Sequence, residues 1–545
     1  MLRGSEALAM LLSGIRAVQV APGSPLGRVE RLLLRGEVEP ARDAAHLART
    51  LSDEVALGLG LGGALLTQEA GAVLLGQTGL VGALGPLRAL GMLGEYRSGL
   101  LLVDASETDP RAALHATAPL PLLEAGAADE LYLLGSLGLD LSVAAGAPVA
   151  LRTHRRALME RAEVRVAAQP AGPEPVRSFC REEAPYLFEG QAALYHAERR
   201  AGLLARLQGV LQALAVRTAG SGRRGVVVAG HLGRRAQARA AGRRLHTLRL
   251  GLAVPLAEAA LRDFCTDLSD VLVLEEGGAY LLTQLRALVH QAGLAVRVHG
   301  TGAVTGHWAP RLGEAELEVE LDRFAGAGGG DGPAPPYDLG RALPLPPLRP
   351  QLDAQGELSE EPWPLFVSRT RRNLPQFLPG DGRLRLLTLL HGLGRPVLVS
   401  TGPGPAFAPG LGRALCDVQP PPGCIAAVAG ALSEATAVEG ALAGRPLAVA
   451  VLSEEEALVD QLGMLDNVLA RRDVLHVLLH AHPPEGAEML EEVAGQLQAG
   501  GAEVLRVDMQ EEDLLHRALE YLAHQRGPRL LVCNVQGTLG SQISG

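Results

Sequence analysis

Lysine and aromatic side chains are the clearest shortages in this sequence. No lysine occurs among the 545 residues, so arginine supplies all 50 basic side chains, which we attribute to GC-rich codon usage rather than to chemistry. Aromatic residues make up 3% of the chain and hydrophobic residues 47%, so large cores must be built from Leu, Val and Ala. The formal net charge of −10 argues against a nucleic-acid-binding protein.

Paired cysteines and long apolar runs are also absent. The five cysteines are scattered and form no CxxC pair, which excludes a cysteine-ligated iron–sulfur cluster of the usual spacing and a zinc ribbon. They are Cys180, Cys265, Cys416, Cys424 and Cys533. Glycine and charged residues interrupt the apolar runs before they reach membrane-spanning length, and the N-terminus shows no signal-peptide pattern. We therefore expect a cytoplasmic protein with reduced thiols that binds no membrane.

The length suits three or more domains of ~100–200 residues each. Shifts in composition predict an α/β domain, a helical linker with a long amphipathic helix at 191–216, a middle α/β domain, a Gly/Pro-rich linker and a last α/β domain. In that order the segments are 1–155, 156–222, 223–324, 325–382 and 383–545.

Alternating short apolar runs and amphipathic stretches predict the fold class. Within the first segment we expect helices at 5–12, 26–35 and 53–66 and strands at 17–20, 72–75, 100–103 and 149–152. Such βα alternation indicates parallel, doubly wound sheets. The sequence therefore predicts a multi-domain α/β protein.

An acidic turn between two apolar strands is the most informative stretch of the last segment. Residues 448–452 and 474–479 read as buried parallel strands. Ser453 is a candidate helix N-cap, and Glu456 stands three residues later, as in a capping box. Since ligands bind at the carboxyl ends of parallel strands, the carboxylates that begin with Glu454 are either a site for a hard cation or the solvated first turn of a capped helix.

The middle segment offers two weaker candidates. His231 lies in a glycine-containing turn that follows the strand at 226–228, and Glu275 ends the strand at 271–274. A turn of this kind is able to approach a ligand closely, although single residues of these types are more often structural than catalytic.

Seven short motifs follow one another in an order that matches a known family. They are GSEA at 4–7, APGSP at 21–25, VAL at 55–57, GLV at 79–81, VLVLEE at 271–276, GEAEL at 313–317 and GPRLLVC at 527–533. Together they resemble the large (alpha) subunit of indolepyruvate ferredoxin oxidoreductase, a thiamine-diphosphate enzyme of the 2-oxoacid:ferredoxin oxidoreductase superfamily.

The resemblance implies a pyrimidine-binding first domain, a transketolase-C-terminal-like middle domain and a diphosphate-binding last domain, in a homodimer. It implies thiamine diphosphate and Mg²⁺ between the first and last domains. Asp53 or Glu54 would act on the aminopyrimidine, and Glu454 would bind Mg²⁺. The implied cofactor-binding residues are Gly23, Ser24, Gly79, Gly402, Gly404 and Ser453.

The sequence departs from the family's motifs at several places, including Asp53, where the family has Glu. The family's CPGCPH turn becomes GPGPAF at 402–407, which has neither Cys nor His. Its GDS motif becomes Ser453-Glu454-Glu455, and the Asn that would be a second Mg²⁺ ligand falls near Ala481, which His480 and its neighbour at 482 flank. Imidazole is a poor ligand for Mg²⁺.

Two functions remain open at this point. One is oxidative decarboxylation of an aryl or branched 2-oxoacid such as indolepyruvate. Since no cysteine cluster is present, the electrons would pass to a partner, either the family's small (beta) subunit or a ferredoxin-like or flavin acceptor. The other is a non-catalytic paralogue that keeps the dimer and serves as a scaffold or regulatory partner.

Overall fold

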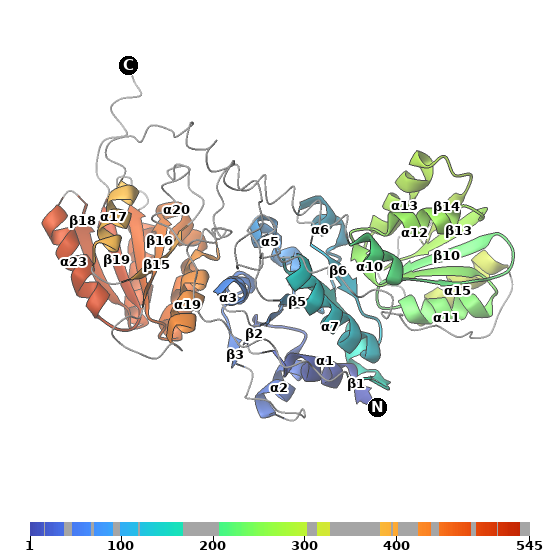
Figure 1. Ribbon diagram of the computed structural model, residues 1–545, viewed down its shortest axis with the longest axis horizontal. Helices are drawn as coiled ribbons and strands as arrows, with labels where there is room; N and C mark the ends of the chain where they lie inside the picture. The colour runs from blue at the N-terminus through green and yellow to red at the C-terminus, as the bar shows by residue number, and fades with distance from the viewer. Residues whose placement is uncertain are drawn as a thin grey trace, which may run out of the picture.

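The fold is seen in a computed structural model in which three sheets of mainly parallel strands follow one another along the chain (Figure 1). The structure describes residues 1–15, 17–36, 46–66, 70–90, 99–117, 120–145, 147–166, 207–301, 313–326, 382–393, 396–401, 423–437, 446–480, 487–509 and 511–534. We call residues 1–166 the N-terminal unit, 207–326 the middle unit and 382–534 the C-terminal unit. The N-terminal unit lies between the other two (Figure 1).

The N-terminal unit is built on a seven-stranded sheet in the order β12-β6-β7-β5-β4-β2-β3. Its strands are β2 (Ala17–Val20), β3 (His46–Arg49), β4 (Gly71–Leu74), β5 (Leu100–Asp104), β6 (Leu122–Glu124), β7 (Val149–Arg152) and β12 (Leu252–Val254). All neighbouring pairs are parallel except β12 with β6. The strand predicted at 72–75 lies one residue earlier, as β4.

Helices cover both faces of this sheet because its strands are apolar on both sides. They are α1 (Gly4–Leu12), α2 (Gly27–Arg35), α3 (Asp53–Leu66), α4 (Gly79–Gly82), α5 (Leu84–Leu90), α6 (Arg111–Thr117), α7 (Ala128–Ala145) and α8 (Arg155–Met159). A two-stranded ribbon of β1 (Leu2–Arg3) and β8 (Arg161–Ala162) joins the ends of the unit. The helix α3 has the predicted bounds.

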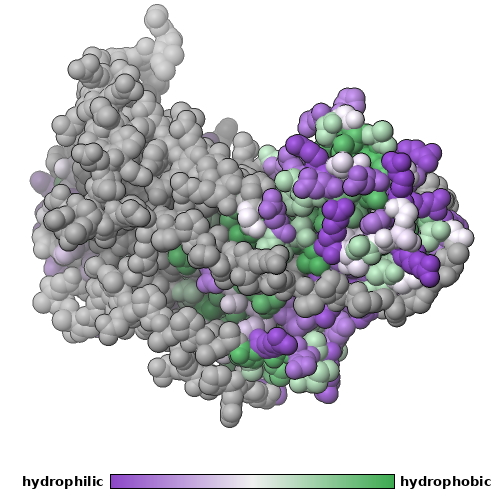
Figure 2. Space-filling model, turned by 45° about the vertical axis from the view of Figure 1, so that its right-hand side comes forward, coloured by the Kyte–Doolittle hydropathy of each residue, from purple (hydrophilic) through white to green (hydrophobic). Residues whose placement is uncertain are grey.

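The middle unit has a five-stranded sheet in the order β14-β13-β10-β11-β9. Its strands are β9 (Ala215–Thr218), β10 (Arg224–Ala229), β11 (His246–Leu250), β13 (Asp270–Leu274) and β14 (Arg297–Gly300). Its helices are α10 (Gln208–Ala213), α11 (Gly233–Gly242), α12 (Glu258–Cys265), α13 (Tyr280–Gln291) and α15 (Glu314–Ala325). Hydrophilic side chains cover much of the face of this unit that Figure 2 turns toward the viewer.

Two features of this unit differ from the sequence prediction. The helix predicted to run to Val216 ends at Ala213, and Ala215 begins the edge strand β9, which pairs antiparallel with β11. The β-branched Val216 and Thr218 favour a strand, and pairing with β11 outweighs the helical periodicity. In addition, β12 leaves the middle unit and extends the sheet of the N-terminal unit beside β6.

The C-terminal unit has an all-parallel sheet in the order β15-β16-β17-β19-β18. Its strands are β15 (Val397–Thr401), β16 (Leu447–Ser453), β17 (Val474–His480), β18 (Glu503–Asp508) and β19 (Arg529–Asn534). Its helices are α17 (Gly382–His391), α19 (Ile425–Ala437), α20 (Glu454–Val459), α21 (Gln461–Leu469), α22 (Ala487–Ala499) and α23 (Glu512–His524). The predicted α/β class with parallel sheets is therefore confirmed.

Apolar clusters join the units. One cluster combines residues of the N-terminal and middle units, such as Leu123 and Leu252, and another combines the N-terminal unit with the C-terminal unit, such as Leu57 and Ile425. None of the described helices is both long and apolar enough to cross a bilayer.

Helices α3 and α19 make a close backbone contact between the N-terminal and C-terminal units. A Cβ atom on Gly58 would lie 2.7 Å from the Cβ atom of Ala427, and one on Gly62 would lie 2.5 Å from that of Ala431. Real Cβ atoms do not approach so closely, so these two positions require glycine for the helices to cross at this separation.

We expect Gly62→Ala to lower the free energy of unfolding by about 1–3 kcal/mol, because the added methyl group overpacks the α3–α19 contact. Gly63→Ala is the matched control. A Cβ atom there meets none of the described atoms within 4 Å, so the change should stabilise the helix by about 0.5–1 kcal/mol. Urea unfolding followed by circular dichroism measures both, and equal effects would contradict the close packing.

Candidate functional site

The carboxyl ends of β2, β4 and β5 gather several of the predicted site residues. Asp53 begins α3, and its Oδ1 accepts a hydrogen bond of 2.7 Å from the backbone N–H of Gly76. Its Oδ2 accepts one of 3.2 Å from the Thr78 hydroxyl. Burial raises the pKa of Asp53, although these two donors oppose the shift. The carboxylate therefore joins α3 to the loop that follows β4.

Gly23 and Ser24 form the turn that follows β2. Gly23 has a φ of +65°, which favours glycine, and its position faces the side chain of Gln77. The Ser24 hydroxyl donates to the carbonyl of Leu75 at 2.8 Å and accepts from the N–H of Leu26 at 3.3 Å. Ser24 thus closes its own turn and ties that turn to the end of β4.

Gly79 lies against the end of β5. It has a φ of +56°, and an added Cβ atom would clash with Asp104 and Ser106. Asp104 is fully buried and accepts from the N–H of Ser106 at 2.7 Å, while burial raises its pKa. Gly23, Ser24, Asp53 and Gly79 are therefore brought together at one edge of the sheet.

The start of α3 meets the start of α19 at the same edge. The Cys424 thiol donates to the backbone carbonyl of Glu54 at 3.4 Å, and a Cβ atom on Gly423 would lie 3.8 Å from the Glu54 side chain. Burial raises the pKa of Cys424 far above its usual value, so this thiol stays protonated. Glu54 therefore takes part in the contact between the two units.

The acidic turn after β16 is a capped helix start. The backbone N–H and the hydroxyl of Ser453 each bond to Oε2 of Glu456, both at 2.7 Å. The predicted capping box is therefore confirmed. Glu454 is the first residue of α20, and its side chain lies outside what the structure describes, as do Gly402 and Gly404.

Asp460 is a functional candidate that sequence reasoning missed. It lies between α20 and α21 and is fully buried. Its Oδ2 accepts from the N–H of Gly423 at 2.8 Å, and its Oδ1 from the N–H of Ala426 at 3.1 Å. Burial raises its pKa to about 7. The chain's own carboxylate thus occupies the N-terminus of α19, where the helix dipole favours an anion.

The contacts at these sheet edges bear on whether the residues suit Mg²⁺ and thiamine diphosphate as ligands. At the carboxyl edge of the third sheet, the Ser453 hydroxyl is engaged by Glu456 and β17 ends in His480, which is an imidazole. Among the described residues no group of three His, Cys, Asp or Glu side chains is placed to hold a metal ion. Both oxygens of Asp53 already accept hydrogen bonds within its own unit. The described residues alone therefore form no Mg²⁺ site, and the side chain of Glu454, the implied ligand, is not among them.

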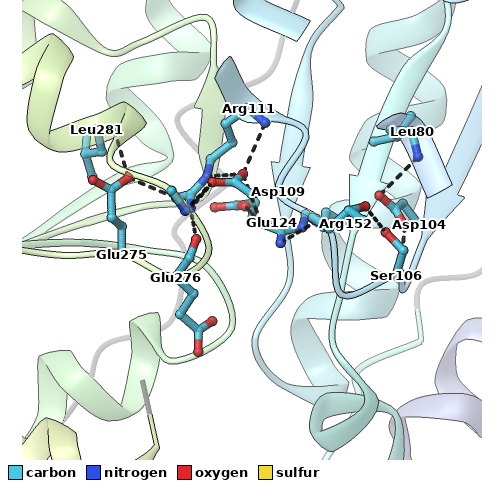
Figure 3. Close-up of polar contacts among 12 residues, drawn as sticks. Leu80, Asp104, Ser106, Asp109, Arg111, Glu124, Arg152, Glu275, Glu276 and Leu281 are labelled. Atoms are coloured by element: carbon cyan, nitrogen blue, oxygen red, sulfur yellow. Dashed lines mark hydrogen bonds and ion pairs between the residues drawn. The ribbon is translucent and has the colours of Figure 1, made fainter. Parts of the chain in front are cut away.

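A second polar cluster lies where the middle unit meets the N-terminal unit (Figure 3). Arg111 is buried and donates from Nε to Asp109 at 2.8 Å, contacts the carbonyl of Glu276 and lies 3.6 Å from Glu275. Arg152 pairs with Glu124 at 3.0 Å. Figure 3 shows the row running from Glu275 in the middle unit to Arg152 and Asp104 at the edge of the first sheet.

Glu275 and His231, the two candidates of the middle unit, both make contacts with other parts of the chain. Glu275 accepts from the N–H groups of Leu281 and Leu282 at 2.8 and 2.9 Å, which caps α13. His231 pairs with Glu276 and stacks on His154 of the N-terminal unit. The turn at His231 that was expected to approach a ligand thus approaches another part of the chain, a contact for which the sequence carries no local signal.

Proteins similar to this chain are found among solved structures. Neither a protein-family profile nor a curated protein sequence matches this chain. The chain is similar to the thiamine diphosphate-dependent 4-hydroxybenzoylformate decarboxylase of Rhodococcus jostii RHA1, at 13% identity over 97% of this chain and 98% of that one, with a TM-score of 0.43. Benzoylformate decarboxylase of Polynucleobacter necessarius gives 13% identity over 98% of each chain and a TM-score of 0.43.

A third similar structure is the 2-oxoglutarate:ferredoxin oxidoreductase of Magnetococcus marinus, at 14% identity over 59% of this chain and 65% of that one, with a TM-score of 0.39. These similarities are too low to identify residue roles, so the site must be judged on its own geometry.

The contacts of Asp53 predict a difference from its neighbour. Asp53→Ala should lower the free energy of unfolding by about 1–3 kcal/mol, because the N–H of Gly76 loses a charged acceptor. Glu54→Ala should change the free energy of unfolding by about 0.5 kcal/mol or less, since the hydrogen bond from Cys424 goes to the backbone carbonyl of Glu54. Urea unfolding of the two variants measures this, and equal losses would contradict a bridging role for Asp53.

The Asp460 carboxyl predicts a pH dependence. The pKa of Asp460 is about 7 in the folded chain and 3.8 in the unfolded chain. The folded state therefore binds the proton more tightly. The resulting stability is fully present below pH 3.8 and is lost as the pH rises through 7. Between pH 5 and pH 7.5 the free energy of unfolding should therefore fall relative to Asp460→Asn, by up to about 1.4 kcal/mol per pH unit.

Urea midpoints at several pH values provide the measurement for Asp460. Asn resembles the protonated acid and cannot titrate, so its curve lacks this component. Asp263→Asn, at an exposed position of α12, should keep the wild-type slope. Parallel curves for the wild type and Asp460→Asn would show that Asp460 does not take up a proton in this range.

Proposed function

We propose that this chain is a non-catalytic partner protein, related in architecture to the large subunits that it resembles, which serves as a scaffold or regulatory subunit. In this role its three units present surfaces to a second copy of the chain and to an oxidoreductase small subunit. Catalysis, including any electron transfer through a ferredoxin-like or flavin protein, would belong to its partners.

The observation that carries this proposal is the position of Asp460. A helix N-terminus at the carboxyl edge of a parallel sheet is a natural place for a phosphate group. At α19 that place holds the buried Asp460 carboxylate, which accepts hydrogen bonds from Gly423 and Ala426. A diphosphate brought to this terminus would have to displace the Asp460 carboxyl group, because its two oxygens already occupy the N–H groups of Gly423 and Ala426.

The contacts of the other residues at the carboxyl edges of the sheets support the same function. Asp53 joins α3 to the loop after β4, Ser453 and Glu456 cap α20, and Cys424 bonds to α3. Each of these groups maintains a turn or a contact between units. Groups at an active site would instead be held in place with capacity left for a substrate.

A single observation favours a second function, the thiamine-diphosphate-dependent oxidation of a 2-oxoacid such as indolepyruvate. Asp53 is a partly buried carboxyl group with a raised pKa, at the carboxyl edge of a sheet and beside another unit. Perturbed carboxyl groups in such positions are often proton donors or acceptors. In this function Asp53 or Glu54 would serve the aminopyrimidine and Glu454 would hold Mg²⁺.

The two functions differ in cofactor binding. For the scaffold function, calorimetric titration of the full chain with thiamine diphosphate and MgCl₂ should give no saturable heat at millimolar cofactor, because Asp460 already occupies the N-terminus of α19. No 2-oxoacid-dependent reduction of an artificial acceptor should occur. Sedimentation velocity should show a dimer at micromolar protein, and added small subunit should form a larger complex.

Variants make the comparison sharper. Saturable binding at micromolar cofactor that Glu454→Ala abolishes, while Glu455→Ala does not, would replace the scaffold function by the oxidoreductase function. Acceptor reduction that Asp53→Asn abolishes would do the same. A chain that remains monomeric and binds neither the cofactor nor the small subunit would refute both.

A further inference from the structure

The junction between the N-terminal and middle units depends on two close backbone approaches. A Cβ atom on Gly126, which follows β6, would lie 2.5 Å from the carbonyl oxygen of His231. A Cβ atom on Gly277 would lie 2.6 Å from the Cβ atom of Asp109, and the N–H of Gly278 donates to Asp109 at 2.9 Å. The turns after β10 and β13 are thus pressed directly against the N-terminal unit.

Two histidine rings are stacked inside this junction. His154 lies between β7 and α8 of the N-terminal unit, and His231 follows β10 of the middle unit. Their ring centroids are 4.0 Å apart and their planes differ by 12°. Nδ1 of His231 faces Oε2 of Glu276, which ties this ring to the turn after β13.

The ring of His154 is held in its neutral form by its own hydrogen bond. Its Nδ1 accepts from the backbone N–H of Arg156 at 3.2 Å, which caps the N-terminus of α8. A nitrogen that accepts a hydrogen bond carries no proton, so protonation at Nδ1 would break the cap. Burial and the neighbouring His231 lower the pKa of His154 to about 4.

Charged groups from both units surround the stack and affect the protonation of His154. Arg152 at the end of β7 and Arg156 of α8 lie on the His154 side and disfavour its protonation, while Glu276 favours it. Glu124 of β6 faces the adjacent Gly230 but is already paired with Arg152. Farther along the junction, ion pairs join Asp129 to Arg234, Glu130 to Arg249 and Glu160 to Arg235.

We propose that the His154–His231 stack is a pH-sensitive contact that holds α8 and the turn after β10 together while His154 is neutral, and that releases them locally when His154 takes up a proton. Release frees the cap of α8 and the face of Gly126 that His231 covers. The apolar cluster and β12 continue to join the two units, so the change is confined to this contact.

The direction of the pH effect follows from the two states of His154. In the closed contact its pKa is about 4, and in the open contact it returns to its usual 6.5. The open state therefore binds the proton more tightly, and closure is lost as the pH falls below 6.5. The equilibrium constant for closure should decrease about tenfold per pH unit until pH 4 is approached.

Hydrogen exchange with mass spectrometry on the full chain tests the proposal. Protection factors, corrected for the intrinsic pH dependence of exchange, are compared from pH 7.5 to pH 5 for peptides that cover 150–160 and 228–236. The wild type should lose protection in both peptides together, about tenfold per pH unit below 6.5. Peptides from β16 and β17 should keep theirs.

His154→Asn is the informative variant, because Asn caps a helix without titrating. Both peptides should then keep constant protection over the pH range. His524→Asn, at an exposed position of α23, should behave as the wild type. Loss of protection at the same pH in His154→Asn and wild type, or constant protection in the folded wild type, would overturn the proposal.

A second variant covers the case in which His154→Asn does not fold. His231→Gln removes a neighbour that lowers the pKa of His154, so that pKa moves back toward its usual value and the pH dependence should shrink in the peptide 150–160. An unchanged dependence would overturn the proposal as well.

Discussion

The crossing of α3 and α19 through Gly58 and Gly62 sets the geometry on which the candidate site depends. Because the helices touch at backbone distance, their N-termini converge, and Asp53, Glu54, Gly423 and Cys424 meet at one edge. The Asp460 carboxylate then completes the start of α19 from the other side. The residues at this edge therefore serve first to hold two units together, and the proposed scaffold function follows from that use.

Much of the fold was predictable because local patterns and tertiary structure agree. The apolar runs that become β5, β7, β13, β16 and β17 are buried on both faces, and the capping box at Ser453 needs only residues close in sequence. Where the two disagree, prediction failed: the helix expected to reach Val216 gives way to β9, because an edge of the second sheet is free to pair with it.

The candidate site was predictable in part. Gly23, Ser24, Asp53 and Gly79 follow strands that are neighbours in a parallel sheet, so their meeting at one edge follows from topology. Asp460 was missed because it lies in an apolar, helix-like stretch, and its partners are more than thirty residues away. The contacts of Arg111 and His231 join separate units, and no short-range pattern encodes them.

The pairing of β12 with β6 of the first sheet affects how the chain folds during synthesis. Strand β6 borders β12 on one side, so the sheet of the N-terminal unit is incomplete until residue 254 has left the ribosome. Up to that point β6 presents an unpaired edge, which is the part of a nascent sheet most open to pairing with a wrong chain. The order in which the polypeptide emerges thus links the completion of the first unit to the emergence of the second.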